Sequence, residues 1–137
     1  MVKSIAIVGG SSDIAKSTIS SMSADNYKFH VLVRDDSHTD ELSASGVSVV
    51  LGDATSEEDI KNFISGVKES GEIHAILHCV GSFAVRPPHA MNKEAFETVI
   101  STNLTSAFLT LSIAGKAMLS QGHGRMVFMS SVAGSLG

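Results

Sequence analysis

Short apolar runs recur along this chain and alternate with longer stretches of mixed apolar and polar residues. Each run is apolar at successive positions, which is typical of strands that are covered on both faces. The runs predict five strands, at Ile5–Val8, Phe29–Val33, Val47–Leu51, Ile73–Val80 and Met126–Met129. Strands that alternate with helices indicate right-handed parallel crossovers. We therefore expect an α/β fold with a Rossmann-like, doubly wound parallel sheet.

Polar caps and glycines predict where the helices between these strands begin and end. The expected helices cover Asp13–Ser23, Thr55 or Ser56 to Lys68, Asn92–Ile100 and Leu104–Leu119. The second start is open because two overlapping capping boxes begin at Thr55 and at Ser56. Gly71 ends that helix, while Gly122 and Gly124 form the turn into the last strand. The pattern contains no repeat or linker, so we expect residues 1–137 to form one domain.

Composition narrows the class of protein and of partner. The chain has 137 residues, 43% of them hydrophobic, and a net charge of −4. The scattered Lys and Arg residues form no basic stripe, so nucleic acid is not an expected partner. The single cysteine, Cys79, and an N-terminus without a signal-peptide pattern indicate a reducing, cytoplasmic compartment. Leu104–Leu119, interrupted by Lys116, is expected to be a helix buried in protein and not a membrane span.

The first apolar strand runs into a glycine turn and then into a helix. Such a turn directs free N–H groups and the positive end of the helix dipole toward a diphosphate above the sheet. Gly9 and Gly10 allow the close approach, although Gly-Gly-Ser-Ser is also an ordinary loop composition. The position directly after an apolar strand favours dinucleotide binding.

Two glycine-containing segments resemble motifs of the short-chain dehydrogenase/reductase family. VGGSSDIA resembles the family's TGxxxGxG turn, with Gly9 on the first glycine, Asp13 on the second and Ala15 on the third. HCVG stands where the family carries NNAG, and only Gly81 matches it strictly. His78 and Cys79 thus replace two asparagines, which changes the hydrogen bonds on the adenosine side.

Two further segments match the family's active-site motifs. STNLTSAF places Asn103 on the asparagine of the fourth helix, and FMSSVAG places Ser131 on the catalytic serine. The resemblance implies that Ser131 holds the substrate oxygen and that Asn103 positions a relay water. The tyrosine and lysine of the family's YxxxK motif would fall beyond Gly137. The chain therefore resembles the N-terminal portion of a family member, incomplete at its C-terminal end.

The resemblance also implies a cofactor site and a preference within it. The expected cofactor-binding residues are Gly9, Ser11, Ser12, Asp13, Ile14, Arg34, Asp53, Ala54, Val80 and Gly81. Arg34, just past the tip of the second strand, favours the 2′-phosphate of NADP over NAD. The neighbouring Asp35 and Asp36 could partly cancel its field, and an ordinary solvated loop arginine is the alternative.

Two of the acidic residues in that set have alternative structural roles. Asp13 would repel a diphosphate unless its side chain turns away to cap the first helix, and we favour the cap. Asp53 resembles the family aspartate that contacts the adenine amino group, but a cap for the helix that starts near Thr55 is the other interpretation. No metal site is expected, because His74 and His78 lie on a strand without nearby carboxylate ligands.

Three functional hypotheses remain open. The first is part of an NADP-dependent oxidoreductase, acting on a carbonyl or alcohol substrate and inactive without the tyrosine and lysine. The second is a noncatalytic dinucleotide-binding or regulatory protein, and the third is another doubly wound domain, such as a flavodoxin-like one. The strand at Met126–Met129 should be an unpaired edge, so we expect a homo-oligomer and a poorly ordered tail over 132–137.

Overall fold

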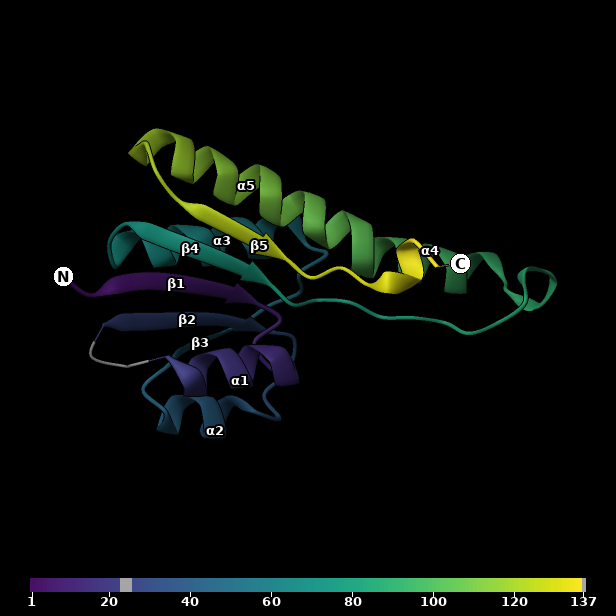
Figure 1. The fold of residues 1–137 in the computed structure, drawn as a ribbon, viewed down its shortest axis with the longest axis horizontal. Coiled ribbons are helices and arrows are strands. Elements are labelled where there is room, and N and C mark those ends of the chain that lie inside the picture. The colour runs from purple at the N-terminus through teal and green to yellow at the C-terminus, as the bar shows by residue number, and fades with distance from the viewer. Residues whose placement is uncertain (23–25, 137) are drawn as a thin grey trace.

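Five parallel strands form one sheet in the computed structural model, which describes residues 1–22 and 26–136. Their order is β3-β2-β1-β4-β5 (Figure 1). The strands are β1 (Lys3–Val8), β2 (Tyr27–Val33), β3 (Ser48–Leu51), β4 (Ile73–His78) and β5 (Arg125–Phe128). The five predicted strands are confirmed, with ends that differ by one or two residues. Tyr27, expected to precede the second strand, is its first residue.

Helices lie between successive strands. They are α1 (Asp13–Ser21), α2 (Thr39–Ala44), α3 (Glu57–Glu69), α4 (Lys93–Ile100) and α5 (Ser106–Gln121). A π turn at Ser101–Thr105 joins α4 directly to α5, so the two predicted helices form one continuous rod. The short helix α2 was not predicted. Ser23, where the first helix was expected to end, lies outside the described residues.

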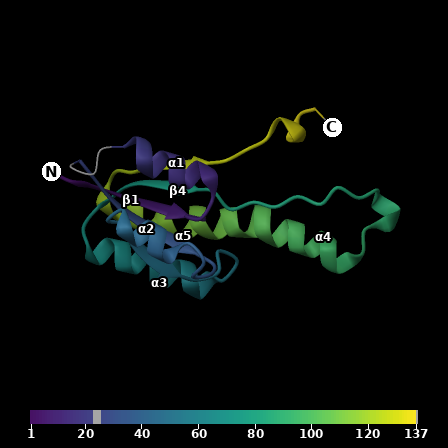
Figure 2. The same cartoon turned by 90° about the horizontal axis from the view of Figure 1, so that it is seen from below.

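The helices cover both faces of the sheet, as a doubly wound fold requires. Alternate residues of β1 point to opposite sides: Ala6 and Val8 pack with α3 and α5, whereas Ile5 and Ile7 pack toward α1 and α2. Figure 2 shows α1 on one side of the strands and α3 with α5 on the other. The central position of β1 therefore gives the domain two separate apolar cores.

Local hydrogen bonds decide between the two predicted starts of α3. Ser56 is the N-cap, and its hydroxyl accepts from the Asp59 backbone N–H at 3.2 Å. The Thr55 hydroxyl instead donates to Asp53, two residues earlier, at 2.8 Å. The helix thus begins at the later of the two predicted starts, although Asp59 accepts from Asp53 N and does not complete a capping box with Ser56. Asn92 caps α4 as predicted, accepting from Ala95 N at 2.9 Å.

The two edge strands are less covered than their apolar sequences predict. On β3, Val50 is 38% and Leu51 57% exposed, and on β5 Val127 is 46% exposed. The expectation that both faces are covered is wrong for β3, because this edge strand extends past the helices that cover the centre. The predicted edge position of the last strand is confirmed.

The long helix is exposed along one side in the single chain. One side of α5 packs on α3 and β4, but Phe108 is 61% and Leu111 52% exposed on the other side. The continuous helix Lys93–Gln121 is long and apolar enough to cross a membrane by length and composition, and only 17% of its apolar window is buried. Within the single chain this helix is therefore only partly buried, and its full burial in protein stays a prediction that needs a second molecule. The apolar sequence of α5 does not by itself identify the molecule that covers its exposed side.

After β5 the chain forms a short 3-10 turn at Val132–Gly134 (η3). Ser131 is its N-cap and accepts from the Ala133 N–H at 3.2 Å. The tail expected to be poorly ordered covers this turn and extends to Gly137, which lies outside the described residues.

The turn from β1 into α1 is a tight passage. Gly9 has φ +88°, and a Cβ there would lie 2.9 Å from Val80 Cγ2 and 3.0 Å from the Cys79 carbonyl carbon. A Cβ on Gly10 would lie 2.6 Å from the Val31 Cβ. Because β1 has β2 on one side and β4 on the other, the chain leaves it through a gap that admits only backbone.

Gly10→Ala should therefore destabilise the protein, by about 1 to 3 kcal/mol, because the added methyl overpacks against the rigid β-branched Val31. Gly66→Ala is the matched control, since a Cβ on this α3 glycine meets nothing within 4 Å. It should stabilise the helix by about 1 kcal/mol through helix propensity. Urea denaturation followed by circular dichroism measures both. Equal changes in the free energy of unfolding for the two substitutions would contradict the close approach of Gly10 to Val31.

Candidate functional site

The glycine turn joins the carboxyl end of β1 to the N-terminus of α1. Gly9 N and Gly10 N both donate to the Leu32 carbonyl at 3.0 Å, which fixes the turn against β2. Ser12 caps α1, with its hydroxyl accepting from Ala15 N at 3.1 Å. The first turn of α1 therefore faces the space above the sheet with its free N–H groups, which is the geometry that favours a phosphate.

Asp13 does not cap the first helix, so that part of the sequence interpretation is wrong. Ser12 has the extended backbone of an N-cap, at φ −69° and ψ 151°, and Asp13 is the first helical residue. An exposed carboxylate in the first turn stabilises the helix dipole. The same charge lowers the positive potential that a diphosphate would meet there.

A pocket of about 630 Å³ opens at this end of the sheet, between the glycine turn, the ends of β2, β3 and β4, and α4. Eight of the ten predicted cofactor residues line it: Gly9, Ser11, Ser12, Arg34, Asp53, Ala54, Val80 and Gly81. Asp13 and Ile14 do not line it, and the Ile14 side chain is 51% exposed. Residues from four separate segments thus converge on one cavity.

The pocket also contains residues that the sequence interpretation missed. They are Leu32, Asp35, Gly52, Thr55, Cys79, Ser82, Thr98, Ser101 and Thr102. Thr98, Ser101 and Thr102 follow each other at the spacing of one helix face and form a polar stripe. That periodicity was a signal in the sequence that could have identified them.

The charged residues of the pocket lie on the β2 side. Arg34 is exposed and takes part in none of the ion pairs between described residues. The Asp35 carboxylate accepts from the Ser37 hydroxyl and, at 3.1 Å, from the Ser37 N–H, and these bonds lower its pKa. Asp35 is thereby tied to its own loop, which leaves the Arg34 guanidinium available to a ligand.

Asp53 is held in a tight turn at the end of β3. Its Oδ1 accepts from the backbone N–H and the hydroxyl of Thr55, both at 2.8 Å, and these two bonds lower its pKa. Its own backbone N–H donates to Asp59 Oδ2 at 2.7 Å. The residue lines the pocket, and Ser56 caps the helix that follows. Asp53 is therefore a turn residue and not the helix cap.

The two residues that replace asparagines after β4 face different ways. Cys79 is half-buried and lines the pocket, and burial raises its pKa while the Ser12 hydroxyl acts in the opposite direction. A raised pKa indicates a protonated, weakly reactive thiol at neutral pH. His78 is buried on the α5 side of the sheet, outside the pocket lining.

The two predicted catalytic residues do not line the pocket. Asn103 lies in the π turn, where its Oδ1 accepts from Ser82 N at 3.0 Å. Its Nδ2 donates to Ser82 O at 2.8 Å and to Val99 O at 2.9 Å. The Asn103 side chain is thus committed to binding the segment after β4, while Ser131 caps the 3-10 turn after β5.

The residues present fit a dinucleotide. The glycine passage excludes side chains from the place where a diphosphate would approach, α1 supplies N–H groups, and Arg34 supplies a free positive charge. The pocket volume is within the range of small-molecule and cofactor sites. Among residues 1–22 and 26–136, no group of three His, Cys, Asp or Glu side chains could hold a metal ion.

Comparison with known proteins places this geometry in a family. A family model described as short chain dehydrogenase matches residues 3–137. A 3-oxoacyl-[acyl-carrier-protein] reductase of Mycobacterium bovis is 29% identical over 98% of this chain and 53% of its own length. A tropinone reductase homolog of Arabidopsis thaliana is 26% identical over 93% of this chain and 51% of its own. The chain thus spans about half the length of these relatives.

Solved structures share the same fold. A short-chain type dehydrogenase/reductase from Mycobacterium ulcerans superposes with a TM-score of 0.90 at 22% identity, over 97% of this chain and 52% of that one. ElxO with NADP bound gives 0.88 at 22% identity, over 98% and 58%. From the glycine turn to the serine segment after β5, this chain belongs to the short-chain dehydrogenase/reductase family.

Proposed function

We propose that this chain is the NADP-binding part of an oxidoreductase that transfers hydride between NADP(H) and a carbonyl or alcohol substrate. The observation that carries the proposal is the backbone-only passage at Gly9 and Gly10, which opens into a pocket lined by Arg34. Membership of the family supports the reaction class, and ElxO, which shares the fold, has been solved with NADP bound.

The chain's own residues have defined tasks in this proposal. The free N–H groups at the start of α1 bind the diphosphate, and Arg34 pairs with the 2′-phosphate. Val80 and Gly81, which follow β4, also line the pocket. The bound cofactor would supply or accept the hydride, while Ser131 would orient the substrate oxygen.

Preference for NADP over NAD follows from charge at the tip of β2. Val33 is buried at the position where an acidic residue would accept from the ribose 2′-hydroxyl of NAD. The next residue, Arg34, is exposed beside the pocket, and the neighbouring Asp35 is bound to Ser37. These features favour a ligand with a phosphate at this place.

We further propose that the chain by itself does not catalyse hydride transfer. Tyr27, the only tyrosine, begins β2 and has Val31, not a lysine, four residues later. No residue of this chain matches the family's proton donor. A noncatalytic, cofactor-sensing protein remains the second candidate, favoured by the hydrogen bonds that occupy the Asn103 side chain. The match of the family model removes the third hypothesis, a domain from outside the family.

An exposed apolar stripe runs along α4 and α5 and supports a homo-oligomer. Its members repeat at helical spacing and are 40 to 63% exposed: Phe96, Ile100, Leu104, Phe108 and Leu111. Contiguous apolar surface of this kind marks an association site. Because the opposite side of α5 packs on α3 and β4, the helix could enter a membrane only by leaving the core. We therefore assign the stripe to a second copy and not to lipid.

NADPH should bind more tightly than NADH, and Arg34→Ala should weaken NADPH binding about tenfold, because a charge-assisted phosphate contact is lost. We expect a loss of affinity no larger than this because Arg34 is exposed and solvent screens its charge. Isothermal titration calorimetry with each dinucleotide measures this. Arg86→Ala, on the exposed loop after β4, is the control and should change nothing. Equal affinities in the unmutated protein would contradict the preference.

The chain should oxidise NADPH with a panel of carbonyl compounds no faster than buffer controls within error. General acid catalysis is typically worth about 10² to 10⁴ in rate, and the family's donor is absent from this chain. The measurement is the absorbance of NADPH over time at high protein concentration. Robust turnover that disappears in Ser131→Ala would overturn this prediction and establish another proton donor.

Light scattering coupled to size exclusion at micromolar concentration should give at least twice the chain mass of 14.3 kDa. Leu104→Glu with Phe108→Glu should shift the protein to monomer, because each places a charge in the apolar stripe. Val85→Glu, at an 88% exposed loop position off the helix, is the control and should leave the mass unchanged. A monomeric unmutated protein that sediments with lipid vesicles would refute the assignment of the stripe.

A further inference from the structure

His78 is a buried histidine whose side chain the proposed function does not use. It ends β4 on the α5 face of the sheet and is 3% exposed. Its Nε2 lies 3.2 Å from Ser106 Oγ, and its Nδ1 lies 3.2 Å from Thr110 Oγ1. The two hydroxyls stand one helical turn apart on α5, so a single imidazole ring spans a full turn of the helix.

The hydroxyl bonds determine where the histidine proton lies. Ser106 Oγ donates its only proton to the Thr102 carbonyl, so it accepts from His78 Nε2. His78 therefore carries its proton on Nε2, and the bare Nδ1 accepts from the Thr110 hydroxyl. Both ring nitrogens are satisfied in this tautomer, which makes it the stable state of a buried imidazole.

The same ring contacts the strand that leads to Ser131. His78 is the register partner of Phe128 at the end of β5, and their ring centroids lie 5.5 Å apart. Met129 N donates to the His78 carbonyl at 3.3 Å, two residues before Ser131. His78 is thus the point at which β4, β5 and the start of α5 meet.

The start of α5 is where the helix departs from regular geometry. In the π turn Ser101–Thr105, the Ser106 N–H bonds to Ser101 O, so the Thr102 carbonyl takes the Ser106 hydroxyl instead. His78 fixes that hydroxyl from the other side. The residue next to Thr102 is Asn103, whose side chain holds the Ser82 backbone at the pocket.

We propose that His78, with its proton on Nε2, is a positioning residue that fixes the π turn bearing Asn103 and the strand end that leads to Ser131. The functional meaning of this proposal rests on the proposed function, because Asn103 and Ser131 are the residues that the family resemblance places near the substrate. Its structural content concerns only contacts within this chain. The imidazole acts through Ser106 on one element and through Phe128 on the other.

The surroundings of His78 keep the ring neutral. The side chains that contact it from α5 and β5, Ser106, Thr110 and Phe128, carry no charge, and its strand neighbour on β1 is Val8. Burial lowers the pKa of His78 from its ordinary value. A depressed pKa in the folded state means that stability falls as pH falls below the unfolded value of about 6.5.

The first test reads the tautomer directly in the 137-residue chain. With ¹⁵N-labelled histidine, two-bond correlation spectra should show His78 with a protonated Nε2 and a bare Nδ1 at pH 7. The pattern should persist at pH 6. A His78 that carries its proton on Nδ1, or that is protonated on both nitrogens at pH 6, would overturn the proposal.

The second test measures the effect on the π turn by amide hydrogen exchange. His78→Leu should speed exchange at Ser82 and over 101–106 by about tenfold, because two buried hydrogen bonds to α5 are lost. His78→Gln, which keeps a donor near the Nε2 position, should recover part of the protection. Ser106→Ala and Thr110→Val are milder variants that should show the same pattern if His78→Leu fails to fold.

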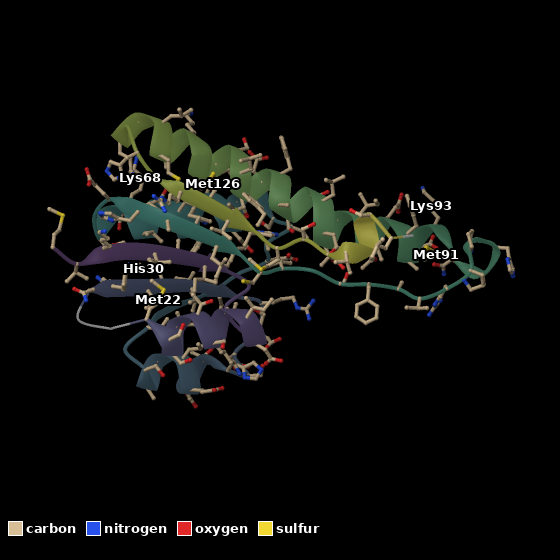
Figure 3. The ribbon with its side chains drawn as sticks, viewed as in Figure 1. Met22, His30, Lys68, Met91, Lys93 and Met126 are labelled. Carbon is tan, nitrogen blue, oxygen red and sulfur yellow. The ribbon has the colours of Figure 1, made fainter. Side chains whose placement is uncertain are left out.

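His30→Leu is the matched control. His30 lies on β2 (Figure 3), is 4% exposed, and has no contact with the π turn. It should leave exchange over 101–106 unchanged whatever its effect on overall stability. Equal acceleration of amide exchange over 101–106 in the His30 and His78 variants would show that His78 contributes only to general core stability. That result would refute the positioning role.

Titration with NADPH separates this proposal from the proposed function. His78 lies outside the pocket lining, so His78→Gln should change NADPH affinity less than twofold. If the unmutated chain binds no NADPH while the tautomer and exchange results hold, the proposed function fails and the positioning role stands. If NADPH binds but His78→Leu leaves the π turn unaffected, the positioning role fails alone.

Discussion

The passage of the chain out of β1 is the constraint on which the rest of this structure depends. β1 is the central strand, and its neighbours are β2 and β4, so the strand order reverses across it. A side chain at Gly9 or Gly10 would collide with Val80 or Val31, which reduces the turn to bare backbone. Crevices at such a reversal are where open α/β sheets bind ligands. Packing in the core and access for a diphosphate therefore have one and the same cause.

The continuous helix from α4 to α5 connects that pocket to two further surfaces. One side carries the polar stripe Thr98, Ser101 and Thr102 that lines the pocket, and a second side carries small and hydroxyl residues against β4. The third side carries the exposed apolar stripe. The π turn at Ser101–Thr105 inserts one extra residue into the helix. It therefore changes how the sides of α4 are aligned with the sides of α5. Its internal hydroxyl bonds therefore affect both the pocket and the association surface.

Strand positions could be predicted from the sequence because continuous apolar runs are a signal of burial that needs no knowledge of the partner. The cap of α1 could not, since Ser12 and Asp13 are adjacent and equally good caps, and only the backbone angles decide between them. The helix α2 buries a single residue, Leu42, and leaves no periodic pattern. The partners of Asn103 and His78 lie 21 and 28 or more residues away, so only the fold brings them together.

The central claim is that the carboxyl ends of β1, β2 and β4 hold a dinucleotide. The most direct measurement is a ¹H–¹⁵N spectrum of the labelled chain recorded during addition of NADPH. We expect that the shifted amides are those of the glycine turn, Arg34, Asp53 and Gly81, while the amides at the opposite ends of the strands stay in place. Shifts confined to the exposed face of α4 and α5, or no shifts at millimolar NADPH, would contradict it.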